Sequence, residues 1–97
     1  MSKSQRRVLR IQKVLKGRSL TGLSNGEIAR ALDESPANIC RALAVMQDEG
    51  AVTRLETGRW ALGIAILQLA QAHANEMADT QGRLLEINRR VAAGAAL

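Results

Sequence analysis

The stretch that decides the fold is residues 24–63, SNGEIARALDESPANICRALAVMQDEGAVTRLETGRWALG, because it carries the start and stop signals of two helices and a hairpin. Its first four residues fit a capping box, in which the Ser24 hydroxyl and the Glu27 carboxylate each satisfy a free backbone amide at a helix start. Apolar side chains then recur at helical spacing as far as Leu32. A short helix ending near Leu32 is therefore expected.

A turn and a longer helix follow. The two acidic residues at 33–34 predict the turn. Ser35 is a favoured N-cap, and Pro36 suits the first helical position, where its missing N–H costs nothing. The helix is expected over residues 36–49, and Gly50 is typical of the residue that ends a helix.

A hairpin closes the stretch. Residues 51–55 and 59–62 predict two short strands, and residues 56–58 predict the turn between them, with Gly58 suited to a positive φ. Short helix, turn, longer helix and hairpin is the element order of a winged helix-turn-helix, which places its longer helix in a DNA groove. Gly63 marks the exit from the hairpin.

A further helix is predicted at residues 4–16, ending at Gly17, with an apolar face and an opposite basic face. Every charged residue before Glu27 is basic, which favours an anionic partner such as nucleic acid. The apolar face consists of Val8, Ile11 and Leu15, with Val14 at its edge, and the basic face of Arg6, Arg10 and Lys13.

Composition restricts the alternatives. The chain has 97 residues, enough for one domain and an appended helix, and a net charge of +5. Trp60 is the only aromatic residue, so the core must be aliphatic, and we expect Trp60 itself to point inward beside Val52 and Leu62. A solvated basic surface without a nucleic-acid partner is the alternative interpretation of the charge.

The sequence also indicates where the protein works. No apolar run is long enough for a membrane span, and no apolar segment follows the basic N-terminus as in a secretory signal. The single cysteine, Cys40, allows no internal disulfide and fits a reducing cytosol. A cytoplasmic, nucleoid-associated protein without membrane contact is therefore expected.

The helix at 36–49 is the predicted recognition helix. Ile39, Leu43 and Met46 fall on one arc and should face the core. On the opposite arc, Asn38 can pair with adenine and Arg41 with guanine or phosphate. The alternatives are that Asn38 only supports the helix cap and that Arg41 is a solvated surface arginine. The candidate DNA-binding residues are Arg6, Arg10, Lys13, Ser35, Ala37, Asn38, Arg41 and Val45, with Arg54 and Arg59 on the wing.

The sequence offers no chemistry of catalysis. His73 and Cys40 lie far apart, and neither zinc-ligand spacing nor a phosphate-cradling glycine motif nor a Ser/His/Asp set is present. We expect no catalytic residues, no metal and no cofactor.

Residues 5–74 resemble the N-terminal winged-helix domain of IclR-type bacterial transcriptional regulators. The most specific part is the run at 57–63, TGRWALG, which is similar to the family's wing signature leading into a linker helix. The resemblance implies DNA binding and transcription regulation in a bacterium or phage. It also rests on Arg7-Val8-Leu9-Arg10-Ile11, Glu27-Ile28-Ala29-Arg30, Arg41-Ala42-Leu43, Met46 and Gly50-Ala51-Val52.

The sequence departs from that family in three places. The family's turn is often Gly-Leu-Pro, but here it is Asp33-Glu34-Ser35. The family usually has two hydroxyl residues early in the recognition helix, where this chain has Ala37 and Asn38, although its Arg41 matches the family arginine. The family's effector-binding domain has no counterpart here, so a stand-alone module without a small-molecule effector is expected.

Residues 64–97 are predicted to form a linker and dimerisation helix, with a doubtful point at Gly82 and a frayed tail at 92–97. Positions spaced alternately by three and four residues form a heptad seam, with the polar residues Gln81 and Asn88 at a positions. The seam favours a homodimer, and a helix that folds back on its own domain is the alternative. The seam residues are Leu67, Ala70, Ala74, Met77, Gln81, Leu84, Asn88 and Val91.

Together these features predict a mainly α protein with two parts. Residues 1–63 form a winged helix-turn-helix of three helices and a two-stranded wing, and residues 64–97 form a C-terminal helical extension. The leading hypothesis is a homodimeric regulator that binds double-stranded DNA sequence-specifically, with helix 36–49 in the major groove and wing 51–62 on the backbone or minor groove. The alternatives are a winged-helix protein-interaction adaptor and a DNA-binding accessory protein of a phage or a replication or recombination complex.

Overall fold

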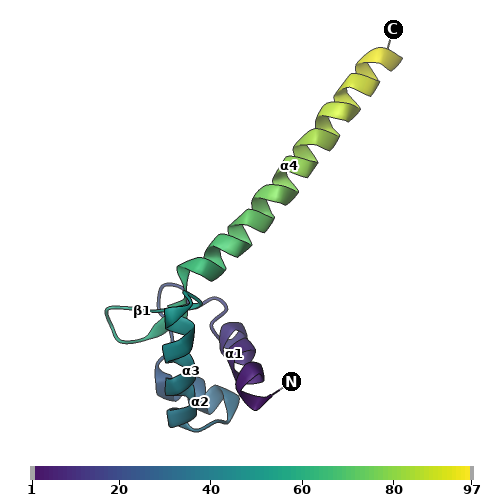
Figure 1. Ribbon diagram of the computed structural model, residues 1–97. Helices are drawn as coiled ribbons and strands as arrows, with labels where there is room; N and C mark the ends of the chain where they lie inside the picture. The colour runs from purple at the N-terminus through teal and green to yellow at the C-terminus, as the bar shows by residue number, and fades with distance from the viewer. Residues whose placement is uncertain (1, 97) are drawn as a thin grey trace. The chain divides into compact units, whose positions relative to one another are not determined.

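The computed structural model describes residues 2–96, and these form helices and one two-stranded antiparallel sheet (Figure 1). The predicted fold class, a mainly α winged helix-turn-helix followed by a C-terminal helix, is confirmed. In chain order the elements are α1 (Lys3–Val14), α2 (Asn25–Leu32), α3 (Pro36–Asp48), β1 (Val52–Arg54), β2 (Trp60–Leu62) and α4 (Ile64–Ala95).

The first helix begins earlier than the sequence predicted because of a cap that the prediction missed. Ser2 is the N-cap of α1, and its hydroxyl accepts a hydrogen bond from the Gln5 amide at 3.2 Å. The Gln5 side chain returns the contact by accepting from the Ser2 amide at 3.0 Å. The other end comes two residues earlier than predicted, because α1 ends at Val14 with Leu15 as its C-cap. Gly17 follows in the turn, with φ of 75°.

Both helices of the predicted helix-turn-helix are confirmed, with their caps. Ser24 and Glu27 form the predicted capping box of α2. Ser35 caps α3 by accepting a hydrogen bond from the Asn38 amide at 3.1 Å. Between them, Asp33 ends α2 in a left-handed conformation with φ of 54°, so the turn is tight without a glycine.

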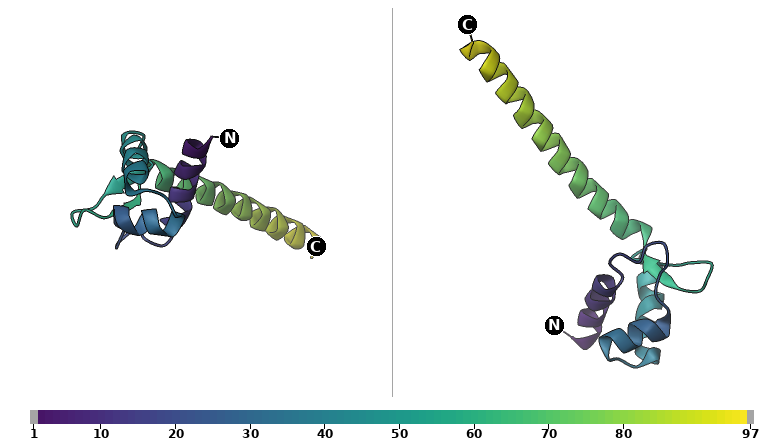
Figure 2. Two further views of the ribbon diagram at one scale, coloured as in Figure 1. Left: turned by 90° about the horizontal axis from the view of Figure 1, so that it is seen from below. Right: turned by 180° about the vertical axis from the view of Figure 1, so that it is seen from behind.

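The wing is the predicted hairpin, with one addition. Val52 pairs with Leu62 and Arg54 with Trp60, and the loop between the strands extends beyond the helices in the views of Figures 1 and 2. The addition is Leu23, which exchanges two backbone hydrogen bonds with Trp60, at 2.8 and 2.7 Å. The loop before α2 is therefore fastened to the wing.

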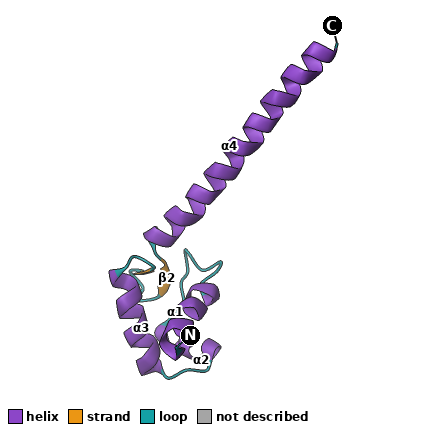
Figure 3. Ribbon diagram, turned by 45° about the vertical axis from the view of Figure 1, so that its right-hand side comes forward, coloured by secondary structure: helices purple, strands orange, loops and turns teal. Residues whose placement is uncertain are grey.

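The core lies among α1, α2 and α3, which Figure 3 shows grouped together with the strands at one end, and it is aliphatic as predicted. Trp60 packs against this core but is only half-buried, and the fully buried residue of β2 is its neighbour Ala61, 1% exposed. The prediction that Trp60 points inward was therefore correct only in part. The largest fully buried side chains are Ile11, Leu15, Ile28, Ile39, Leu43 and Met46.

Two glycines meet where the wing leaves the domain. Gly63 is buried, and a Cβ atom at this position would lie 2.1 Å from the Gly50 carbonyl oxygen. Gly50 itself has φ of 77° and ends α3 as predicted. Residue 63 must be glycine because the opposing atom belongs to the backbone and cannot rotate away.

The C-terminal helix corrects two predictions. α4 is continuous from Ile64 to Ala95, so Gly82 does not interrupt it. The tail that we expected to fray from Ala92 is helical through Ala95, and Leu97 lies outside the described residues. The chain divides into two compact units after Leu67. The expected domain boundary at residue 63 remains a prediction.

A glycine substitution tests the close approach at the wing exit. Gly63→Ala should lower the free energy of unfolding by about 3 kcal/mol, because the methyl group overlaps the Gly50 carbonyl. Gly82→Ala is the matched control, since nothing lies within 4 Å of its added Cβ and alanine raises helix stability by about 1 kcal/mol. Urea denaturation of both variants measures the difference, and equal stabilities would refute the steric argument.

Candidate nucleic-acid interface

The outward face of α3 is set by its buried face. Ile39, Leu43 and Met46 are each at most 2% exposed, as predicted for the core side of this helix. The opposite side is exposed and small, with Ala37 and Ala44 beside Arg41. Val45, 61% exposed, lies on the same outward side, which can approach base edges in a DNA groove.

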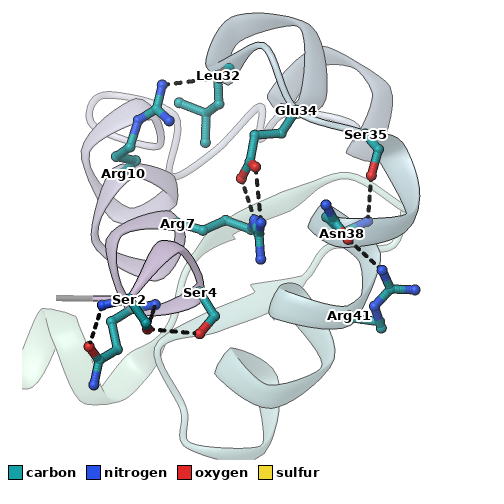
Figure 4. A network of polar contacts seen from close by, with 10 residues as sticks. Ser2, Ser4, Arg7, Arg10, Leu32, Glu34, Ser35, Asn38 and Arg41 are labelled. Carbon is teal, nitrogen blue, oxygen red and sulfur yellow. Dashed lines mark hydrogen bonds and ion pairs between the residues drawn. The ribbon is translucent and has the colours of Figure 1, made fainter.

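Asn38 and Arg41 form a linked pair on this face rather than two independent contacts. Arg41 Nη2 donates a hydrogen bond to Asn38 Oδ1 (Figure 4). Because arginine can only donate, the amide oxygen must be the atom that faces it, and Asn38 Nδ2 remains free as a donor. Ser35 and Ala37 are both exposed at the start of the same helix, and the Ser35 hydroxyl is engaged in the cap.

The basic residues of α1 divide into free and occupied ones. Arg6 and Lys13 are exposed and form no ion pair within residues 2–96. Arg10 is exposed but donates from Nη2 to the Leu32 carbonyl oxygen at 3.0 Å, so its guanidinium also holds the end of α2. Two of the three α1 residues that were predicted to contact DNA are therefore free of other bonds.

Arg7 was missed as a site residue. Its guanidinium forms a two-point ion pair with the Glu34 carboxylate, through Nε–Oε2 and through Nη2–Oε1 at 3.0 Å (Figure 4). This contact lowers the pKa of Glu34 below its ordinary range, through the hydrogen bond from Arg7 first. The sequence did hold a signal, since Arg7 lies four residues before the buried Ile11, at the edge of the apolar stripe.

A groove runs between α1 and the outward face of α3. Arg7 of α1 lies in this groove together with Asn38 and Arg41 of α3. The groove lies within the first compact unit and borders the predicted reading surface. Its lining residues are Ser4, Gln5, Arg7, Val8, Asn38, Arg41, Ala42 and Val45.

The two wing arginines have different surroundings. Arg54 lies over the Trp60 ring, 5.6 Å from its centroid, which holds the guanidinium while leaving its N–H groups available. Arg59 is engaged in the fold: it donates to the carbonyl oxygens of Thr21 at 2.9 Å and Gly22 at 3.0 Å. It also pairs with Glu27 at 2.8 Å.

Glu27 connects the wing to the start of α2. Its Oε1 atom accepts the Ser24 amide at 2.9 Å and lies 2.8 Å from the Arg59 guanidinium. The pKa of Glu27 is lowered, chiefly by its hydrogen bonds with the Ser24 backbone and side chain, and further by the charge of Arg59. The capping box predicted from sequence is therefore also the anchor of the wing.

The net positive charge is confined to one part of the chain. Residues 1–67 contain eleven Lys and Arg against six Asp and Glu, whereas residues 68–97 contain three of each. The net charge of +5 therefore belongs entirely to the part that carries α3 and the wing. A localised basic surface on a helix-turn-helix scaffold is typical of nucleic-acid binding.

The predicted seam of α4 is an exposed and uncharged helix face. With Leu67 taken as an a position, every charged residue of residues 68–96 falls at b, c or f. Two ion pairs off the seam join Glu86 to Arg89 at 3.3 Å and to Arg90 at 3.1 Å. All six predicted dimerisation residues are exposed: Leu67, Ala74, Met77, Leu84, Asn88 and Val91.

Residues 2–96 contain no group of three or more His, Cys, Asp or Glu side chains placed to hold a metal ion. Within the same range, no helix combines the length and apolar character that crossing a membrane requires.

Comparison with known proteins identifies the fold. No protein-family model matches the chain, and no curated protein does. The structure is similar to that of the Agobacterium tumefaciens repressor BlcR, with 29% identity, a TM-score of 0.60 and 71% of this chain covered. This chain spans only 27% of the length of that repressor chain.

Two further solved structures are both mutants of Lactococcus lactis ZitR. They are 22% and 20% identical, with TM-scores of 0.45 and 0.47. The matches cover 84% and 90% of this chain, and 60% and 70% of the ZitR chains. The BlcR match supports the winged helix-turn-helix fold.

The lowered pKa values of Glu27 and Glu34 predict a loss of stability in acid. Both carboxylates have folded pKa values below their ordinary value of 4.5, so the stability they contribute is complete above pH 4.5 and is lost as pH falls through the folded pKa. Glu27→Gln and Glu34→Gln should each make the free energy of unfolding less dependent on pH below 4.5. Urea denaturation of each variant between pH 3 and 7 measures how its free energy of unfolding depends on pH. A pH dependence equal to that of wild type would contradict the assignment.

Proposed function

We propose that the protein is a sequence-specific regulator of transcription that binds double-stranded DNA and has no catalytic activity. The observation that carries this proposal is the outward face of α3, where Asn38, Arg41 and Val45 are presented by a helix whose other side is fully packed. Helix α3 enters the major groove, and its N-terminal residues meet the base edges.

The second contact is made by the wing. Arg54 reaches the backbone or minor groove from its position over Trp60. Arg59 acts chiefly by fixing the wing to α2 through Glu27, and it contributes to DNA binding through that position. On α1, Arg6 and Lys13 supply contacts to phosphate.

Assembly is the third part of the proposal. The uncharged face of α4 covers the same face of a second copy, so the protein acts as a homodimer. The d positions of this face are all apolar, and the a positions are apolar except for Gln81 and Asn88. A face of this kind, with all charges at b, c and f, matches one that packs against a partner helix. Two copies related by twofold symmetry would bind inverted half-sites about one or two DNA turns apart.

The IclR-type assignment also belongs to this proposal. It is supported by the TGRWALG run at 57–63 and by the passage from the wing into a long helix. The proposed function takes place in the cytoplasm.

Selection from a random pool of duplexes tests the proposed function directly. One enriched motif is expected, with an inverted repeat if the protein is a dimer. Binding without enrichment would favour a DNA-binding accessory protein. No binding to any duplex would contradict the DNA proposal and favour a protein-interaction adaptor.

Substitutions on α3 should separate base contacts from phosphate contacts. Asn38→Ala and Arg41→Ala should each weaken binding to the selected duplex by about 1–3 kcal/mol. The difference in affinity between the selected duplex and random DNA should therefore become smaller. Lys13→Ala is the control and should weaken both duplexes alike. Fluorescence anisotropy over a salt series measures these changes. The logarithm of the binding constant plotted against the logarithm of the salt concentration should have a slope of about −5 to −9 for a dimer with roughly 6–10 phosphate contacts.

Two outcomes of that series would count against the proposal. An equal loss on both duplexes for Arg41→Ala would make this residue a phosphate contact. An affinity that does not change with salt would refute DNA binding through the basic surface.

The α4 seam is tested by placing charges on it. Leu84→Asp with Val91→Asp would bury like charges between partner helices, at a cost of several kcal/mol, or roughly 3–5. The double variant should remain folded, since neither residue belongs to the core of the winged helix. Light scattering should show that the double variant is a monomer. This monomer should bind a single half-site weakly. A wild-type protein that is monomeric at micromolar concentration would remove the dimer from the proposal.

A further inference from the structure

Arg7 differs from its neighbours on α1 because its guanidinium is occupied. Its side chain is only 14% exposed, and its partner Glu34 is 18% exposed. The contact joins residues 27 positions apart, so it ties α1 to the turn before α3. Arg6, one residue earlier, is exposed and forms no ion pair within residues 2–96.

Glu34 lies in the turn between α2 and α3, from which α3 starts. It follows Asp33, the left-handed C-cap of α2, and precedes Ser35, the N-cap of α3. Its own amide donates to the Ala29 carbonyl oxygen at 2.9 Å, which fixes its backbone to α2. Beside the Ser35 cap, its side chain is a second group of the turn that can set how α3 begins.

A second arginine holds the other side of the same turn. Arg10 lies three residues after Arg7, on the same side of α1, and donates to the Leu32 carbonyl oxygen at 3.0 Å. Charged contacts thus hold the turn at Leu32 and at Glu34 (Figure 4). The Arg7 contact is made through two N–H groups, a geometry that restricts orientation as well as distance.

We propose that Arg7 is a positioning residue for DNA recognition: through Glu34 it fixes the turn that starts α3, and it does not bind phosphate itself. This inference rests on the proposed function of α3 as a recognition helix. The competing assignment is that Arg7 is one more cation of a basic surface and that Glu34 only reduces its charge.

The two assignments predict opposite signs at Glu34. If charge alone matters, removing this carboxylate frees Arg7 and raises affinity for every duplex. If position matters, removing Glu34 displaces the start of α3, so it weakens binding to the selected duplex just as removing Arg7 does. The effect of Glu34→Ala on specific binding therefore distinguishes them.

The experiment uses the full chain, the duplex enriched by selection and a random duplex of equal length. Arg7→Ala and Glu34→Ala should each weaken binding to the selected duplex about tenfold, with less than about a twofold change on random DNA. The double variant should be no worse than either single one, because both remove the same contact. Exchanging the charges, Arg7→Glu with Glu34→Arg, should recover part of the lost affinity.

Arg6→Ala is the matched control, because it removes an adjacent cation that has no partner. It should weaken both duplexes alike and reduce the salt slope by about 1 per protomer. Arg7→Ala should leave that slope unchanged. A Glu34→Ala variant that binds both duplexes more tightly, or an Arg7→Ala variant that behaves like Arg6→Ala, would overturn the proposal.

A measurement without DNA keeps this inference separate from the proposed function. Hydrogen exchange at the Ile39 and Asn38 amides, which bond to Ser35 at 3.1 Å, reports the order of the α3 start. Arg7→Ala and Glu34→Ala should exchange faster there, whereas Arg6→Ala should match wild type. If no duplex binds wild type, the DNA proposal fails and this measurement still decides: unchanged exchange in both variants overturns the positioning role. Glu34→Gln serves as the conservative variant if an alanine substitution unfolds the domain.

Discussion

The burial of one side of α3 is the constraint on which the rest of the structure depends. Ile39, Leu43 and Met46 occupy the core that α1 and α2 also fill, so the rotation of α3 about its axis is fixed. Once that rotation is fixed, the opposite side must face solvent, and its residues are determined by helical geometry. That side carries Arg41 between small residues, so the same packing that stabilises the domain also produces a surface suited to a groove.

Charge has two roles in this domain. Arg7, Arg10 and Arg59 make contacts that position the turn, the end of α2 and the wing, as their bonds to Glu34, the Leu32 carbonyl and Glu27 show. Arg6 and Lys13 have no such bonds and remain available to phosphate. The basic composition alone therefore overstates the number of cations free for DNA. The positioning contacts also explain how a chain with one aromatic residue and a small aliphatic core holds its wing in place.

Much of the fold was predictable from local signals, because caps and helix-ending glycines act within a few residues of where they stand. Ser24, Ser35 and Gly50 gave the helix boundaries in this way. Contacts between distant segments were not predictable, since the sequence does not say which arginine meets which carboxylate across 27 residues, or that Leu23 bonds to β2. On α3 the exposed face was predicted correctly, but the hydrogen bond between Asn38 and Arg41 was not. On α4, Gly82 proved compatible with a continuous helix because its neighbours favour helix. The DNA contacts and the dimer remain predictions.

Chemical footprinting of the selected duplex tests the central claim most directly. Dimethyl sulfate modifies guanine N7, which lies in the major groove, and adenine N3, which lies in the minor groove. The account predicts protection of guanine N7 where α3 enters, with adenine N3 protected beside it under the wing. It also predicts that Arg41→Ala removes protection at a guanine while Arg54→Ala affects only the adenines. Protection confined to the minor groove, or none at any guanine of a bound site that contains guanines, would contradict the placement of α3 in the major groove.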